Sequence, residues 1–231
     1  MDHRKLTGHP ALIFDFDGTV AQLFADYPLE QTAALLEKQL RPFGVNFSAE
    51  QDVFESFAVI LIHTFDSEKE RLAALACADR ILTEAECRAV DSCRPVPGVE
   101  DAFRKFSDAG IPFGIATNNS VDCIRLFLKQ RCGRLPVPIV GRSGLHPELL
   151  KPNPYSLHAV LQLLNRPVEN AVFFGDSVSD FFCAQNLGCR FLGMGPTVKK
   201  HDRLLSVLPE EEIFSDYTRL LDELRAEGIA L

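Results

Sequence analysis

The chain has 231 residues, of which 46% are apolar and 24% charged, a composition typical of a folded globular protein rather than a disordered one. Acidic groups outnumber basic ones by 32 to 24, and no basic stripe offsets the formal charge of -8, so we expect no nucleic-acid partner. No segment reaches the roughly 20 consecutive apolar residues that a membrane-spanning helix needs, so we expect no membrane partner either.

The amino terminus and the cysteines indicate the compartment. Residues 1–10 contain Asp, His, Arg and Lys without an apolar stretch, which argues against a secretory signal. The seven cysteines are odd in number and lack the two-residue gap of a zinc or redox motif, so we expect free thiols in a reducing compartment. The sequence therefore predicts a cytoplasmic protein. The short basic run 199–201 (Lys-Lys-His) is interpreted as a solvated surface turn.

Five short apolar runs have the pattern of buried parallel strands. Each is nearly all apolar, as expected when helices cover both faces of a sheet. The runs are Ala11 to Phe14, Ile111 to Ile115, Val137 to Val140, Ala171 to Phe174, and Arg190 to Leu192. Helical patterns over 99–109 and 154–164 alternate with the later runs, which predicts an α/β doubly wound layout.

Between the first and second runs the pattern changes to helix signals without a convincing strand. Three candidate capping boxes lie there: Ser48 with Gln51, Ser67 with Glu70, and Thr83 with Glu86. A stretch of roughly 75 residues is too long for an ordinary loop. We therefore expect a small all-helical domain over 21–94, inserted into a core domain formed by 1–20 and 95–231.

The most informative stretch follows the first predicted strand and reads Phe-Asp-Phe-Asp-Gly-Thr over 14–19. Asp15 and Asp17 leave the strand end two positions apart, so both can reach the crevice at the carboxyl edge of the sheet. Such a pair can bind a hard cation and divide the roles of nucleophile and acid/base between them. A solvated turn is the alternative, because Asp and Gly favour turns.

Polar residues of a matching kind follow the other predicted strands. The second is followed by Thr117-Asn118-Asn119-Ser120, whose hydroxyl and backbone amides suit a phosphoryl oxygen, although a plain helix cap is also compatible. The fourth is followed by Gly175 to Asp180, which contributes Asp176 and Asp180, or alternatively a helix cap with an exposed acid. Lys151 precedes a predicted helix, and taken alone it would be a surface charge.

Together these stretches resemble the motifs of the haloacid dehalogenase superfamily of hydrolases, in the order that this family has them. The matching segments are Asp15 to Thr19 (Asp-x-Asp-Gly-Thr), Thr117 with Asn118, Lys151 to Pro154 (Lys-Pro-x-Pro), and Gly175 to Asp180 (Gly-Asp-Ser-x-x-Asp). The resemblance implies a Rossmann-like doubly wound parallel sheet. The helical insertion is similar to the cap domain of the subgroup that includes phosphoglycolate phosphatase.

The resemblance also implies a mechanism. Asp15 would attack the phosphorus of a small phosphorylated metabolite to give an aspartyl-phosphate, while Asp17 would protonate the leaving oxygen and later activate water. Lys151 would supply positive charge to the phosphoryl oxygens, and Thr117 with the Asn118 amide would hold the transferring group.

A divalent cation belongs to the same expectation, because clustered carboxylates would repel a phosphate dianion. The resemblance implies Mg²⁺ bound by Asp15, the backbone carbonyl of Asp17, and Asp176, with Asp180 binding directly or through water. The expected enzyme is a monomer or homodimer.

Three alternatives stay open at this point. A phosphomutase would share all four motifs, and a regulatory protein could have kept the fold without turnover. Phosphonate-cleaving relatives use a Schiff-base lysine in the cap, where Lys38 and Lys69 lie in patterns typical of exposed helix faces. The stretch 54–63, expected to contact substrate, offers few charges. His63 could contact substrate, although we favour a packing role for it, and we interpret Arg41 as a helix-end surface charge.

Overall fold

The computed structural model describes residues 10–133 and 135–231, and its centre is a six-stranded parallel sheet. The strand order is β5-β4-β1-β6-β7-β8, and every neighbouring pair is parallel. The strands are β1 Ala11–Phe14, β4 Phe113–Ala116, β5 Ile139–Val140, β6 Ala171–Gly175, β7 Arg190–Met194 and β8 Ile213–Phe214. All five predicted strands are present; the sixth, β8, was not predicted because two residues are too few to form a pattern.

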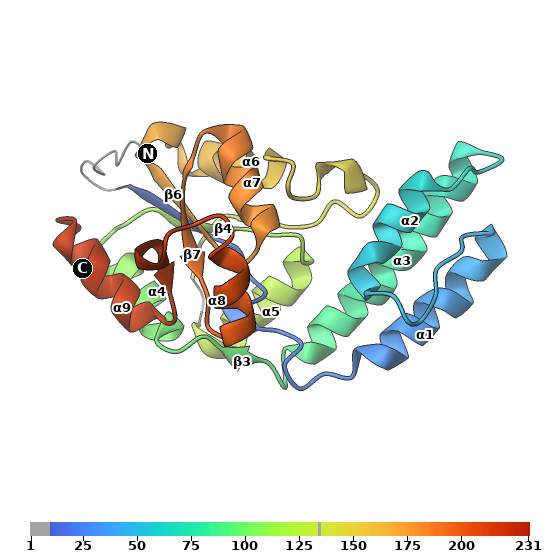
Figure 1. Ribbon diagram of the computed structural model, residues 1–231, viewed down its shortest axis with the longest axis horizontal. Helices are drawn as coiled ribbons and strands as arrows, with labels where there is room; N and C mark the ends of the chain where they lie inside the picture. The colour runs from blue at the N-terminus through green and yellow to red at the C-terminus, as the bar shows by residue number, and fades with distance from the viewer. Residues whose placement is uncertain (1–9, 134) are drawn as a thin grey trace.

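Helices cover both faces of this sheet, which confirms the doubly wound α/β fold (Figure 1). Side chains alternate along β1, so Leu12 and Phe14 join one apolar cluster while Ala11 and Ile13 join the other. The first cluster receives side chains from α4 Val99–Asp108, α5 Val121–Arg131 and α9 Tyr217–Ala226. The second receives them from α6 Tyr155–Leu164, α7 Val178–Leu187 and α8 Val198–Leu204.

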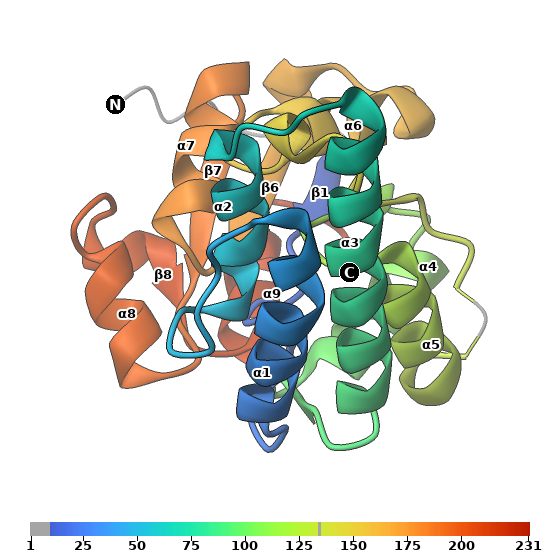
Figure 2. The ribbon, with the colours of Figure 1, turned by 90° about the vertical axis from the view of Figure 1, so that its right-hand side faces the viewer.

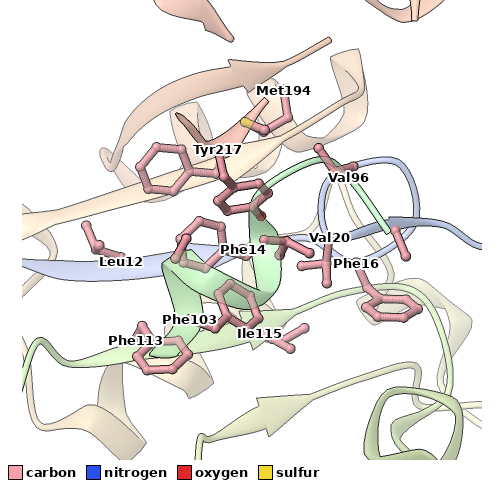
Figure 3. Packing of buried hydrophobic residues seen from close by; sticks show 14 of the residues in the cluster. Leu12, Phe14, Phe16, Val20, Val96, Phe103, Phe113, Ile115, Met194 and Tyr217 are labelled. Atoms are coloured by element: carbon pink, nitrogen blue, oxygen red, sulfur yellow. The ribbon is translucent and has the colours of Figure 1, made fainter. Parts of the chain in front are cut away.

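Aromatic packing fixes the strand that carries the first motif (Figure 3). The ring of Phe14 stacks on that of Phe174 at 4.8 Å between centroids, and Phe103 and Tyr217 close around it. The buried Tyr217 hydroxyl donates a hydrogen bond to the carbonyl oxygen of Thr19 at 3.2 Å. The loop after β1 is therefore tied to the carboxyl-terminal helix as well as to the sheet.

The helical insertion lies to one side of the sheet and has an apolar cluster of its own (Figures 1 and 2). Its helices are α1 Leu29–Leu40, α2 Ser56–Ile62 and α3 Glu68–Ala89. Where the chain leaves and rejoins the core, β2 Ala21–Gln22 pairs antiparallel with β3 Arg94–Pro95. These two-residue strands were not predicted. The exact domain limits at 21 and 94 remain a prediction.

Only one of the three candidate capping boxes begins a helix. The Ser67 hydroxyl accepts a hydrogen bond from the backbone N–H three residues on, at 3.2 Å, and starts α3. Ser48 lies before a turn and starts no helix. The interpretation of Thr83 and Glu86 as a helix start is wrong, because both lie well inside α3.

Among residues 10–133 and 135–231 no helix is both long enough and apolar enough to cross a membrane. All seven cysteines are free thiols, as predicted. Residues 1–9, on which the expectation of no secretory signal rests, lie outside the described residues.

Candidate active site

The sheet brings the predicted polar residues together at its carboxyl edge. Asp15 follows β1, Thr117 follows β4 and Asp176 follows β6. Because β1 lies between β4 and β6, these strand ends are immediate neighbours in the sheet. The loop that precedes α6 brings Lys151 to the same place, and the first turn of α7 brings Asp180.

Three carboxylates form a compact acidic cluster at this edge. One oxygen from each of Asp15, Asp176 and Asp180 lies within 4.8 Å of the others. Their exposed fractions are only 6%, 9% and 1%. A set of carboxylate oxygens is the donor set that hard divalent cations prefer, so these residues fit such an ion.

Lys151 is the buried counter-ion of the acidic cluster. Its Nζ lies 2.5 Å from Oδ1 of Asp15 and 2.5 Å from Oδ1 of Asp180. Burial opposes the charged ammonium, yet the two carboxylates hold the pKa of Lys151 above its usual value. Asn118 positions this lysine: its Oδ1 accepts from the Lys151 backbone N–H at 2.9 Å, and its Nδ2 donates to the Lys151 carbonyl at 3.4 Å.

Asp180 is both a helix-capping residue and a carboxylate of the site, the two roles that its motif allowed. It forms a capping box with Ser177 at the start of α7: Oδ2 accepts from the Ser177 hydroxyl at 2.7 Å and from its backbone N–H at 3.1 Å. Its other oxygen pairs with Lys151. The acid is therefore a helix cap, but a buried one that faces the site.

Asp17 is held apart from the acidic cluster. Its Oδ1 accepts a hydrogen bond from the backbone N–H of Leu23 at 2.8 Å, which ties the carboxyl group to the segment leading into the insertion. Burial raises the pKa of Asp17, although Lys200 opposes the shift. A carboxyl group that retains its proton more readily is suited to act as an acid.

Two carboxyl groups of the acidic cluster have raised pKa values. Burial raises the pKa of Asp15 to about 6 against the pull of Lys151, and Asp180 adds to the rise. Burial raises the pKa of Asp176 to about 8 in the same way, against the pull of Lys200, with Asp180 and Asp15 raising it further. Burial is thus the main cause of both shifts, and the neighbouring carboxylates add to it.

Lys200 is the site residue that the sequence interpretation missed. It lies on α8 rather than in a solvated turn, and its ammonium forms an ion pair with Asp176. Gly18, at φ +91°, makes this approach possible, since a Cβ there would lie 1.7 Å from the Lys200 Nζ. The available signal was its place in the chain, because α8 directly follows β7 and begins at the same sheet edge.

The loop 117–120 serves both as a helix cap and as part of the site. The Thr117 hydroxyl donates to Oδ1 of Asn119 at 3.0 Å and accepts from its backbone N–H at 3.2 Å. Ser120 caps α5 by accepting from the backbone N–H of Cys123 at 3.4 Å. The cap interpretation and the site interpretation are therefore compatible.

The residues of the insertion singled out in the sequence either contact other residues of the insertion or are exposed. The His63 ring packs edge-on against Phe65 at 4.5 Å between centroids, as its packing interpretation predicted. Arg41 pairs with Glu37 at 2.9 Å and its side chain is 77% exposed. Lys38 and Lys69 are both exposed, as expected.

Comparison with known proteins identifies the family. Residues 9–188 match the model of the haloacid dehalogenase-like hydrolases, so the chain belongs to this family of hydrolases. It is 28% identical over 223 residues to a phosphoglycolate phosphatase of Cereibacter sphaeroides, covering 94% of this chain and 98% of the relative. It is 25% identical over 222 residues to a phosphoglycolate phosphatase of Psychrobacter arcticus, covering 92% and 94%.

Solved structures share the fold over almost the whole chain. A structure described as a predicted phosphatase from Clostridium acetobutylicum superposes with a TM-score of 0.69 at 15% identity, covering 94% of this chain and 99% of the other. A hydrolase from Pseudomonas syringae superposes with a TM-score of 0.62 at 18% identity, covering 94% and 98%. At these identities the likeness concerns the fold.

Proposed function

We propose that this hydrolase is a Mg²⁺-dependent phosphatase that cleaves a small phosphorylated metabolite through an aspartyl-phosphate intermediate. The observation that carries the proposal is the buried acidic cluster of Asp15, Asp176 and Asp180 with the Lys151 ammonium 2.5 Å from two of its members. The relatives named phosphoglycolate phosphatase support the same chemistry.

In this proposal two carboxylates divide the covalent work. An oxygen of Asp15 attacks the phosphorus, the bond to the ester oxygen breaks, and Asp17 gives that oxygen its proton. Asp17 then takes a proton from water, whose oxygen attacks the phosphorus and releases inorganic phosphate with free Asp15. The raised pKa of Asp17 supports its part as the acid.

The acidic cluster would hold Mg²⁺ through Asp15, Asp176 and the backbone carbonyl of Asp17, with Asp180 binding directly or through water. The bound ion would supply the positive charge that lets a phosphate dianion approach four carboxylates. The raised pKa values of Asp15 and Asp176 support a cation here, since they arise from burial and from neighbouring carboxylates, both of which a bound cation would offset.

Lys151, Thr117 and Asn118 would orient the phosphoryl group. Lys151 supplies a fixed ammonium beside the nucleophile, and the Thr117 hydroxyl with the Asn118 amide would contact phosphoryl oxygens. Phosphoryl transfer depends mostly on such alignment and charge compensation.

The insertion over 21–94 would act as the cap that excludes water and selects the substrate. The segment 54–63 supports a substrate whose organic part needs few charged contacts, because Phe54, Leu61 and Ile62 are exposed there. We propose a cytoplasmic monomer or homodimer, in keeping with the free thiols.

The test is phosphate release from an aryl phosphate and from phosphoglycolate, with Mg²⁺ and with EDTA. Asp15→Asn should lower kcat by roughly 10³-fold or more, the scale on which a lost nucleophile acts. The matched control is Asp222→Asn, whose carboxylate is 71% exposed on α9 and should leave the rate unchanged. Activity that survives in Asp15→Asn or in EDTA would contradict the proposal.

A further inference from the structure

Helix α3 connects the insertion to the core without a break. Residues in the middle of the helix, from Ala74 to Leu82, pack in the apolar cluster of the insertion. Ala89 and Val90, at its end, pack in the cluster of the core. Figure 2 shows α3 between α1 and α5, and it contacts both helices. Glu86 therefore lies where the helix passes from one body to the other.

Glu86 reaches from this point into the loop 117–120. Its side chain is completely buried. Oε1 accepts from Nδ2 of Asn119 at 3.2 Å, and Oε2 accepts from the backbone N–H of Ser120 at 2.9 Å. A carboxylate loses its hydration on burial, so it needs such partners together with a counter-ion.

Arg142, just after β5, is that counter-ion, and its side chain is only 1% exposed. It donates to Glu86 through Nη1 at 2.7 Å and Nη2 at 3.2 Å. Its other donors reach Asp79 at 2.7 Å and Thr83 at 3.0 Å on α3, and the carbonyl of Asn118 at 3.1 Å. These bonds use all five guanidinium N–H groups.

The partners of the pair lead directly to the candidate site. Asn119, held by Glu86, also accepts from the Thr117 hydroxyl. Asn118, whose carbonyl is held by Arg142, grips the Lys151 backbone through its side chain. In the described part of the chain the pair makes no hydrogen bond to the acidic cluster, yet it holds Asn119 and Asn118, which contact Thr117 and Lys151.

We propose that Glu86 and Arg142 are positioning residues that fix the loop 117–120 beside the nucleophile and tie its position to that of the helical insertion. The inference rests on the proposed phosphatase function, in which this loop and Lys151 hold the phosphoryl group. Because three partners of Arg142 lie on α3, movement of this helix is passed to the loop through one buried ion pair.

The test compares two Glu→Gln variants of the full chain. Glu86→Gln removes the charge of the buried pair, and Glu227→Gln does the same to the half-buried bidentate pair of Arg190 with Glu227. We expect Glu86→Gln to weaken inhibition by inorganic phosphate and to lower kcat/KM, each at least tenfold, with Glu227→Gln within twofold of wild type. A purely structural role would lower the thermal midpoint while leaving the phosphate inhibition constant of the folded enzyme unchanged.

A second readout does not depend on activity. Amide hydrogen exchange of peptides covering 113–124 should be at least tenfold faster in Glu86→Gln than in wild type, and unchanged in Glu227→Gln. Exchange or phosphate inhibition within twofold of wild type in folded Glu86→Gln would overturn the inference. If the wild type turns over no phosphoester, the proposed function fails, and the exchange measurement alone decides whether Glu86 holds the loop.

If Glu86→Gln does not fold, the same two measurements are made on Arg142→Lys. It keeps the positive charge beside Glu86 and gives up the fork that reaches Thr83 and the Asn118 carbonyl. We expect shifts in the same direction that exceed threefold for both phosphate inhibition and loop exchange. Values equal to those of wild type would overturn the inference.

Discussion

Replacing Lys151 by Met would remove a charge from the acidic cluster while keeping most of the side-chain volume. The lysine side chain is 3% exposed, and the Asp15 and Asp180 side chains that it contacts are 8% and 1% exposed. The main effect is therefore electrostatic, because a linear side chain of similar length leaves little cavity. Breaking a buried ion pair by deleting one partner costs about 3–5 kcal/mol of the free energy of unfolding.

The cost should depend on pH with a defined sign. The folded-state pKa of Asp15 is about 6, above its ordinary value of 3.8, even though Lys151 lowers it. Stability linked to this raised pKa is fully present below the unfolded value and is lost as the pH rises through the folded value. Without Lys151 the folded pKa rises further, so the variant loses more stability relative to wild type at pH 8 than at pH 5.

Urea unfolding in EDTA at both pH values measures this difference. We expect Lys151→Met to lower the free energy of unfolding by about 3–5 kcal/mol at pH 8. At pH 5 the loss should be smaller by at least about 1 kcal/mol, because one pKa unit corresponds to about 1.4 kcal/mol. Lys105→Met, which breaks an exposed pair with Asp101, is the matched control and should cost under about 1 kcal/mol. A loss in Lys151→Met that is equal at both pH values would refute the reasoning.

Two further substitutions test the neighbourhood of Asp176. Gly18→Ala should reduce activity about 100-fold or more, because its Cβ would displace Lys200 and Asp176. The control is Gly110→Ala, where the glycine also has a positive φ but a Cβ would meet no atom within 4 Å. This control should cost only about 1–2 kcal/mol of the free energy of unfolding and leave activity intact. Lys200→Met should lower the Kd for Mg²⁺ several-fold in calorimetry, because a competing ammonium leaves Asp176; an unchanged or higher Kd would speak against that competition.

The strands and most of the candidate site could be predicted because their signals are local. A strand buried on both faces is apolar throughout, and the polar residues that follow it must emerge at the same edge of a parallel sheet. That reasoning predicts Asp15, Thr117 and Asp176 at the carboxyl edge of the sheet, and the strand order makes their strand ends immediate neighbours. Lys151 and Asp180 needed the family motifs as well, since neither position alone differs from a surface charge or a helix cap.

Contacts between distant segments left a weaker signal in the sequence. Lys200 reaches Asp176 from a helix that starts after the next strand, and in the sequence it is one of two adjacent lysines. Thr83 and Glu86 have the spacing of a capping box, but three positions also separate neighbours on one face of a helix. In α3 both residues lie on one face and accept hydrogen bonds from Arg142. Their spacing therefore reflects a tertiary contact and not the start of a helix.

The charges around the candidate site connect these findings. Among the residues that the structure describes, four carboxyl groups lie near two ammonium groups, those of Lys151 and Lys200; the carboxyl groups are those of Asp15, Asp17, Asp176 and Asp180. Burial is the largest cause of the raised pKa values of Asp15, Asp17 and Asp176, and nearby carboxylates raise them further, because a buried carboxylate without enough counter-charge holds its proton. A divalent cation would cancel this difference of two charges, and the cluster of carboxylate oxygens is the donor set that the proposed Mg²⁺ prefers.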